Sequence, residues 1–233
     1  MKRLALLAAL LLGTSMCSSE ADHAKAELLR DDQAAPQPSA TSVAASRAWQ
    51  SSYVAETAGN FEAALAALAE LPSPQSAGYL ACYRRGWLQY RLGRNADSVA
   101  AYRTAVLLEP VGVEARVAQL APLIAQSKWP EVVALAEDVL KRDPQNYLAL
   151  SRLAYAKFSL QSFSESEQLY ARVLELYPSD VEARSGLAWV TLRLGKQKEA
   201  AALFTQVLEV SNNHTLAARG LYEATSRKKP KSR

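Results

Sequence analysis

The chain has 233 residues, 49% of them apolar, which is enough for one or two packed domains. Ala, Leu, Glu, Arg and Gln are abundant and no long glycine-rich or β-branched tract occurs, so the composition favours an all-α protein. The net charge is +4, but seven cations lie in residues 1–3 and 227–233, so residues 4–226 carry 4 − 7 = −3, which argues against a nucleic-acid-binding body.

The first 17 residues have the plan of an export signal. Lys2 and Arg3 precede an apolar run from Leu4 to Leu12, and small residues follow it. Nine apolar residues are too few to span a bilayer, so we expect a segment that directs export and is then cleaved.

Cys17 leaves two interpretations of the signal open. Its place resembles the lipidated cysteine of a bacterial lipoprotein signal, although Thr14 and Met16 depart from the aliphatic and small residues of that pattern. Ordinary cleavage near Cys17 is the alternative. If the cysteine is lipidated, Ser18 after it implies the outer membrane by the same resemblance. The expected location is therefore the periplasm, either free or attached to the outer membrane through Cys17.

Two segments carry no apolar periodicity. Residues 18–44 are rich in Ala, Ser, Pro and Gln, so ordering them would cost more entropy than burial returns, and we expect a flexible tether. Residues 227–233 hold five Lys and Arg, which indicates a basic disordered tail. Contact of this tail with anionic lipid or an acidic partner is the alternative.

A period of 34 residues organises residues 45–226. Units start at Ala45, Tyr79, Val113, Tyr147 and Val181, with a partial unit from Thr215. Position 3 is alanine in all but the first, and position 20 reads Ala64, Ser98, Val132, Ser166 and Ala200. Position 15 includes Gly59, Gly93 and Gly195, position 24 includes Tyr102, Tyr170 and Phe204, and position 32 includes Pro110, Pro144 and Pro178. Two helices per unit are predicted, because glycine ends the first, small residues let the second approach it, and proline stops the second.

This pattern resembles the tetratricopeptide repeat. The resemblance implies a right-handed α-solenoid of about five two-helix units, with a final helix from Thr215 that caps the last apolar face. The first unit departs most, because Ser51 and Ser52 replace a Leu-Gly pair. The expected organisation is a signal in 1–17, a tether in 18–44, the solenoid with its cap in 45–226, and the tail in 227–233.

The resemblance also implies a concave groove lined by the first helix of each unit, at positions 2, 5, 9 and 12. Eight aromatic residues at positions 5, 9 and 12 are candidates for binding a partner there: Trp49, Tyr53, Tyr83, Trp87, Tyr90, Tyr155, Phe158 and Trp189. One interpretation is that these rings only pack between neighbouring helices. The other is that they anchor an extended or helical segment of a partner protein. Three of the four tryptophans lie in this set, which favours the second interpretation. Glu114 and Glu182 fall at the groove edge, where solvation explains them best.

Motifs for chemistry are missing from the sequence. It has no HExxH, no glycine-rich phosphate loop and no Cys-x-x-Cys pair, and His23 and His214 stand far apart. We therefore expect a non-enzymatic protein without catalytic residues, metal or cofactor. The groove columns also lack the Lys and Asn that clamp a terminal carboxylate in co-chaperone members of the family.

The resemblance implies a scaffold of the bacterial cell envelope that binds a partner segment and assists assembly of a pilus, secretion or outer-membrane machine. Two alternatives remain open. One is an adaptor for polysaccharide export or cell-wall enzymes, and the other is a self-associating assembly factor.

Overall fold

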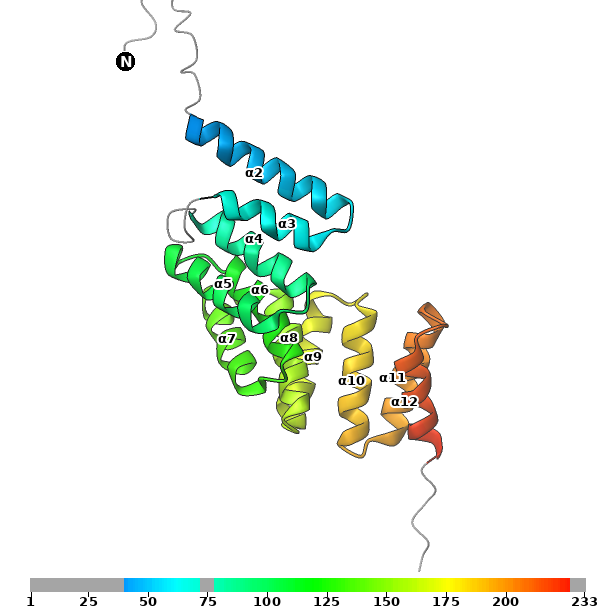
Figure 1. Ribbon diagram of the computed structural model, residues 1–233. Coiled ribbons are helices and arrows are strands. Elements are labelled where there is room, and N and C mark those ends of the chain that lie inside the picture. The colour runs from blue at the N-terminus through cyan, green and yellow to red at the C-terminus, as the bar shows by residue number, and fades with distance from the viewer. Residues whose placement is uncertain (1–39, 72–77, 227–233) are drawn as a thin grey trace, which may run out of the picture. The chain divides into compact units, whose positions relative to one another are not determined.

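The structure, a computed structural model, describes residues 40–71 and 78–226. All regular elements in these ranges are helices (Figure 1). They are α2 Ala40–Thr57, α3 Phe61–Ala67, the 3₁₀ helix η1 Leu68–Glu70, α4 Gly78–Arg91, α5 Asn95–Leu108, α6 Glu114–Ala125, α7 Trp129–Arg142, α8 Tyr147–Ser159, α9 Phe163–Leu176, α10 Val181–Arg193, α11 Gln197–Val210 and α12 Thr215–Ser226. The expected all-α solenoid is confirmed. The signal segment, Cys17, most of the expected tether and the basic tail lie outside the described residues.

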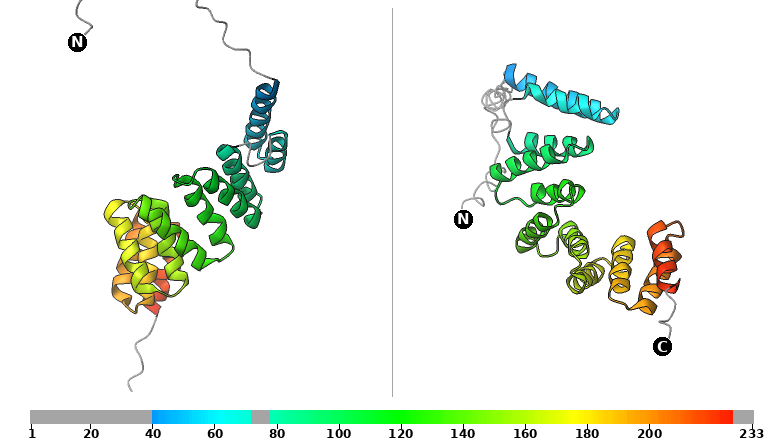
Figure 2. Two further views of the ribbon diagram at one scale, coloured as in Figure 1. Left: turned by 90° about the vertical axis from the view of Figure 1, so that its left-hand side faces the viewer. Right: turned by 60° about the horizontal axis from the view of Figure 1, so that its bottom comes forward.

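The helices follow the 34-residue period along the chain. The first helices of the second to fifth units and the final helix begin within one residue of the expected starts. The first unit is different, because α2 begins at Ala40, five residues before Ala45. Ser42, Val43 and Ala44 are exposed, so this end of α2 reaches beyond the packed part of the helix. Successive helices pack against one another in chain order (Figure 2).

Position 15 adopts the left-handed conformation in every unit. Gly59, Gly93 and Gly195 have φ of 74°, 73° and 83°, as the sequence predicts. Ser127 and Gln161 have φ of 55° and 61° at the same position, which their residue types did not indicate. The turn is therefore imposed by the packing of the two helices, and glycine only makes it less costly.

The two helices of a unit cross at positions 8 and 20. In three units a serine hydroxyl at this crossing donates to the backbone carbonyl opposite, with Oγ···O distances of 2.7 to 2.8 Å. The pairs are Ser52 with Ala64, Ser98 with Gly86, and Ser166 with Ala154. Ser52 thus supplies from the first helix what Ser98 and Ser166 supply from the second, which explains how the first unit tolerates its unusual sequence.

Aromatic residues at position 24 fill the space beside the crossing. The Tyr102 ring packs on Gly86, and the buried Phe204 ring packs on Gly220 of α12. Phe204 and α12 residues Ala217 and Ala224 share one apolar cluster with Leu192 of α10. The last helix therefore covers the apolar face of the fifth unit, as a capping helix must.

Replacing Gly220 with alanine is expected to destabilise the protein. A Cβ at this position would overlap the Phe204 ring, which is fully buried and has no free space to enter. Overpacking costs about 1–3 kcal/mol, part of which the better helix propensity of alanine offsets, so we expect a net loss of about 1 kcal/mol or more. Denaturant unfolding measures this difference.

Gly112→Ala is the matched control. Its Cβ would meet only the Glu109 carbonyl, at 3.6 Å. Equal stability of Gly220→Ala and Gly112→Ala would contradict the packing described for the capping helix.

Candidate partner-binding groove

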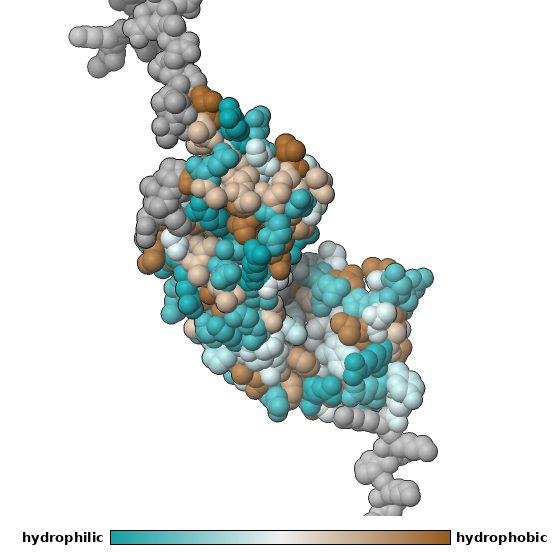
Figure 3. All heavy atoms as spheres, in the orientation of Figure 1, coloured by the Kyte–Doolittle hydropathy of each residue, from teal (hydrophilic) through white to brown (hydrophobic). Residues whose placement is uncertain are grey.

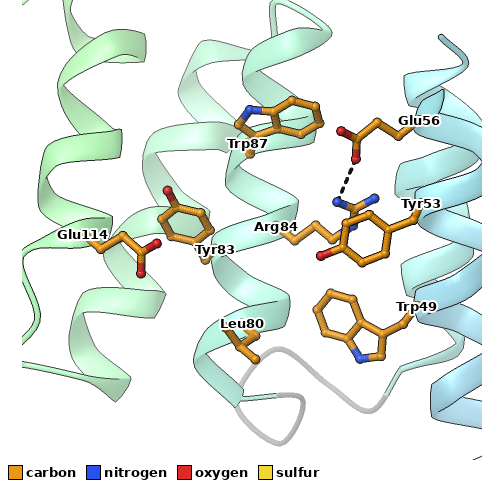
Figure 4. A pocket seen from close by; sticks show the side chains of 8 residues that line it. All are labelled: Trp49, Tyr53, Glu56, Leu80, Tyr83, Arg84, Trp87 and Glu114. Atoms are coloured by element: carbon orange, nitrogen blue, oxygen red, sulfur yellow. Dashed lines mark ion pairs between the residues drawn. The ribbon is translucent and has the colours of Figure 1, made fainter.

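A pocket of about 680 Å³ opens between α2, α4 and the start of α6 (Figure 4). We call it the N-terminal pocket. It is lined by Trp49, Tyr53 and Glu56 of α2, by Leu80, Tyr83, Arg84 and Trp87 of α4, and by Glu114 of α6. Four of the eight aromatic residues singled out from the sequence therefore lie in one pocket.

Arg84 organises the wall of the N-terminal pocket that α2 and α4 share. Its side chain is only 8% exposed, and Nη1 lies 2.8 Å from Glu56 Oε2. Arg84 Nε donates to Ser52 Oγ at 2.9 Å, and the guanidinium lies 3.6 Å from the centroid of the Tyr53 ring. The Arg84 guanidinium therefore forms an ion pair with Glu56, donates a hydrogen bond to Ser52 at the helix crossing and stacks on the Tyr53 ring.

The Trp49 and Tyr53 rings continue this wall, 6.3 Å apart and inclined by 25°. Trp87 packs edge-on against Phe61, with ring centroids 5.9 Å apart, and Arg91 lies over both rings. Tyr53 is 53% exposed, whereas Trp49 and Trp87 are half-buried on the apolar cluster of the first unit. The pocket thus combines fixed indole walls with one ring that is open to solvent.

A second pocket, of about 340 Å³, lies between α4, α6 and α8. We call it the central pocket. Tyr83, Trp87 and Glu114 line both pockets, so the two adjoin each other, and together we call them the groove. The other residues of the central pocket are Tyr90, Tyr102, Val113, Val117, Ala118, Ala121, Asn146, Leu148 and Arg152.

Three of the predicted groove residues line neither pocket. Tyr155 packs edge-on against Trp129, Phe158 against Phe163 and Trp189 against Phe204, with ring centroids 5.3 to 5.6 Å apart. Tyr155 nevertheless keeps 44% of its surface exposed. Both interpretations of the aromatic column therefore have examples here: Trp189 and Phe158 pack on second helices, and Trp49, Tyr53, Tyr83, Trp87 and Tyr90 line the groove.

Sequence reasoning missed the charged residues of the groove. Arg84 and Arg152 both occupy position 6 of their units, a position that the sequence analysis did not consider. Glu114 was expected to be merely solvated, but its Oε2 accepts a hydrogen bond of 2.9 Å from the Tyr79 hydroxyl and it lines both pockets. The repeat of arginine at position 6 was the signal that could have revealed two of these residues.

The tyrosine hydroxyls around Glu114 remain protonated. Burial raises the pKa of Tyr79 well above its ordinary value, and its bond to Glu114 raises it further. Burial and the Glu114 charge also raise the pKa of Tyr83. In the groove, Tyr83 therefore presents a neutral phenol beside two carboxylates, Glu114 and the Glu56 that is paired with Arg84.

The described part of the chain holds no group of three or more His, Cys, Asp or Glu that could bind a metal. Within it, too, no helix has the length and hydropathy needed to cross a membrane. On the face drawn in Figure 3, apolar and polar side chains are interspersed.

Two tetratricopeptide-repeat family models match the chain, at residues 83–119 and 123–190. Solved structures with the same fold include the MamA protein, with 14% identity, a TM-score of 0.65, and coverage of 74% of this chain and 94% of that one. MamA from Desulfovibrio magneticus RS-1 is 20% identical, with a TM-score of 0.67 and coverage of 73% and 97%. A tetratricopeptide repeat protein from Parabacteroides merdae is 18% identical, with a TM-score of 0.70 and coverage of 78% and 72%.

No protein of curated function matches this chain in sequence. The fold is a tetratricopeptide solenoid. Such solenoids bind partner proteins on extended surfaces and are generally not enzymes, so the fold indicates a protein-binding scaffold.

Arg84→Gln is expected to lower stability by about 2–4 kcal/mol, because it leaves Glu56 without its counter-ion and removes the bond to Ser52. Arg103→Gln is the matched control, since the Arg103–Glu131 pair is exposed on both sides and should contribute less than about 1 kcal/mol. The free energy of unfolding in urea measures both. A difference below about 0.5 kcal/mol between the two variants would rule out the organising role of Arg84.

Proposed function

We propose that this protein is a scaffold of the bacterial cell envelope that holds a segment of a partner protein in the groove and assists assembly of an envelope complex. One observation carries the binding part of this proposal. Five aromatic side chains from two first helices line two adjoining pockets instead of all packing into the core.

The chemistry of the groove supports a polypeptide ligand. Trp and Tyr are typical anchors at protein interfaces, because they bury a large area at little cost in conformational entropy. The tyrosine hydroxyls, Arg84 and Glu114 supply donors and acceptors for the backbone of an extended segment. The two pockets, of about 680 and 340 Å³, suit a few side chains of a peptide rather than the surface of a globular protein.

The location in the envelope is supported by the sequence alone. Lys2, Arg3 and the apolar run before Cys17 have the plan of an export signal, and the segment to residue 39 separates that signal from α2. If Cys17 is lipidated, this segment lets the scaffold search for a partner near the membrane. Its work there is binding, and it recruits or orients components of a pilus, secretion or outer-membrane machine.

Partner capture tests the groove. Purified protein, immobilised through the C-terminus, is incubated with solubilised envelope, and retained proteins are identified by mass spectrometry. We expect Tyr53→Ala to retain at least about tenfold less partner than wild type, because loss of one anchor costs about 1.4 kcal/mol or more. Tyr53 is exposed enough for this change to leave the fold intact.

Tyr222→Ala is the control for the capture experiment. Tyr222 is also an exposed tyrosine, but it lies on α12, far along the chain from α2 and α4. If Tyr53→Ala and Tyr222→Ala retain the same proteins to the same extent, the groove is not the binding surface. Retention of this chain alone would instead favour a self-associating assembly factor, and retention of glycan would favour a polysaccharide adaptor.

Cell fractionation tests the location. We expect the wild-type protein in the envelope fraction, with its mature N-terminus at or near Cys17. If Cys17 carries lipid, Cys17→Ser will move the protein from the membrane fraction to the soluble periplasm; if cleavage is ordinary, both forms will be soluble there. A cytoplasmic protein with an intact N-terminus would refute export.

A further inference from the structure

The central pocket contains an arginine without a counter-ion. Arg152 of α8 lines this pocket, and no carboxylate among the described residues forms an ion pair with it. Its Nε is buried and has no hydrogen-bond acceptor. Arg84 and Arg116, by contrast, are each 8% exposed and are paired with Glu56 at 2.8 Å and Asp138 at 3.0 Å. Arg152 is half-buried and, unlike Arg84 and Arg116, has no carboxylate partner among the described residues.

The surroundings of Arg152 offer only partial compensation. Burial lowers the pKa of Arg152, while the Tyr90 and Tyr147 hydroxyls act in the opposite direction. The Asn146 side chain is already engaged, because its Oδ1 accepts from the Ala149 N–H at 3.0 Å and its Nδ2 donates to Asp143. A partly buried charge without a carboxylate partner costs stability, so its presence in a pocket points to a function in binding.

The space in front of Arg152 has a cause in the sequence. Position 9 is aromatic in four units, but it is Ala121 in the third. Val117, Ala118 and Ala121 of α6 form the floor of the central pocket, between the α4 and α8 walls. The missing ring leaves room for a ligand side chain between Tyr90 and Arg152.

The charges select the kind of ligand. One guanidinium matches one carboxylate, and Glu114 in the same pocket disfavours a doubly charged phosphate. The central pocket adjoins the N-terminal pocket at Tyr83 and Trp87, so a chain that occupies both pockets extends beyond Arg152 instead of ending there. These features favour the side chain of an internal Asp or Glu over a chain terminus.

We propose that Arg152 pairs with an Asp or Glu side chain of the partner segment, and that this pair fixes the position of the segment along the groove. This proposal rests on the proposed function, because it takes a polypeptide as the ligand. Apolar residues beside the acidic one occupy the aromatic N-terminal pocket.

A paired peptide library tests the role of Arg152. Its members are short peptides with blocked ends, a central Glu, and Leu, Phe or Trp at neighbouring positions. Each has a counterpart with Gln at the centre, and a third form with Gln at the centre and a free C-terminal carboxylate. Binding of each peptide to the full chain is followed by fluorescence anisotropy.

Wild type is expected to bind the best central-Glu peptides about tenfold more tightly than either counterpart, as one charge-assisted pair provides. Arg152→Gln should abolish this preference without weakening the binding of central-Gln peptides. Arg152→Lys should restore part of the preference. Ala121→Leu, which fills the central pocket, should weaken binding of the central-Glu peptides while Arg152 is still present.

Stability separates a binding role from a structural one. Arg152→Gln should unfold at the same urea concentration as wild type or at a higher one, because it removes a half-buried charge that has no carboxylate partner. A marked loss of stability would assign Arg152 to the fold and overturn the proposal.

Three further results would also overturn it: wild type binding Glu and Gln peptides alike, Arg152→Gln keeping the preference, or preference for the free C-terminal carboxylate. Peptides that bind wild type without a preference for Glu, but no longer bind Tyr53→Ala, would refute only the role of Arg152 and would support the groove as the binding site. If Tyr53→Ala binds every peptide as tightly as wild type does, the groove is not the binding surface. If no peptide binds, Arg152 does not select an internal Glu side chain and the proposal is wrong. The partner-capture experiment then tests separately whether the groove is the binding surface.

Discussion

The close crossing of two helices within each unit is the constraint on which the structure depends. Small residues or glycine that face each other let two helices approach this closely, and positions 8 and 20 supply them in every unit but the third, which has Leu120 and Val132 there. Once this distance is set, the large residue at position 24 must find its space against the neighbouring helix, and the chain must turn sharply at position 15. Each unit then leaves an apolar face that only the next helix can cover.

The groove arises where units depart from this common plan. Ser52 at position 8 of the first unit accepts from Arg84, which holds the guanidinium beside Glu56 and Tyr53. Ala121 at position 9 of the third unit removes a ring that every other unit keeps. Ser52 acts on Arg84 from within the buried crossing, and Ala121 lines the central pocket, so both departures alter the groove without altering the fold.

The fold could be predicted from the sequence because its determinants are local and repeated. Alanine at position 3, small residues at position 20 and proline at position 32 each act within one unit, and the repetition made them visible. The positive φ of Ser127 and Gln161 could not be predicted from residue type, since packing imposes it. The start of α2 at Ala40 could not be predicted either, because a segment of alanine and serine is compatible with both a helix and a flexible tether.

The site was predicted less completely. The aromatic columns indicated which faces to examine, but a column does not tell whether a ring lies over a second helix, as Trp189 does over Phe204, or lines a pocket, as Trp87 does. That depends on pairs about 30 residues apart, such as Arg84 with Ser52 and Glu56. Such pairs cannot be recognised from the 34-residue repeat, because each of them occurs in only one place.

The first unit has an unusually short second helix, and this affects how binding and local folding are linked. α3 has seven residues and passes directly into η1, so on its own it is too short to be a stable helix. Its apolar cluster includes Leu88 of α4, and Trp49 and Trp87 pack against it. A ligand held between those two indoles would therefore tie α2 to α4 and slow local opening of the whole first unit. Amide hydrogen exchange in α2 and α3 would then report occupancy of a groove that neither helix forms alone.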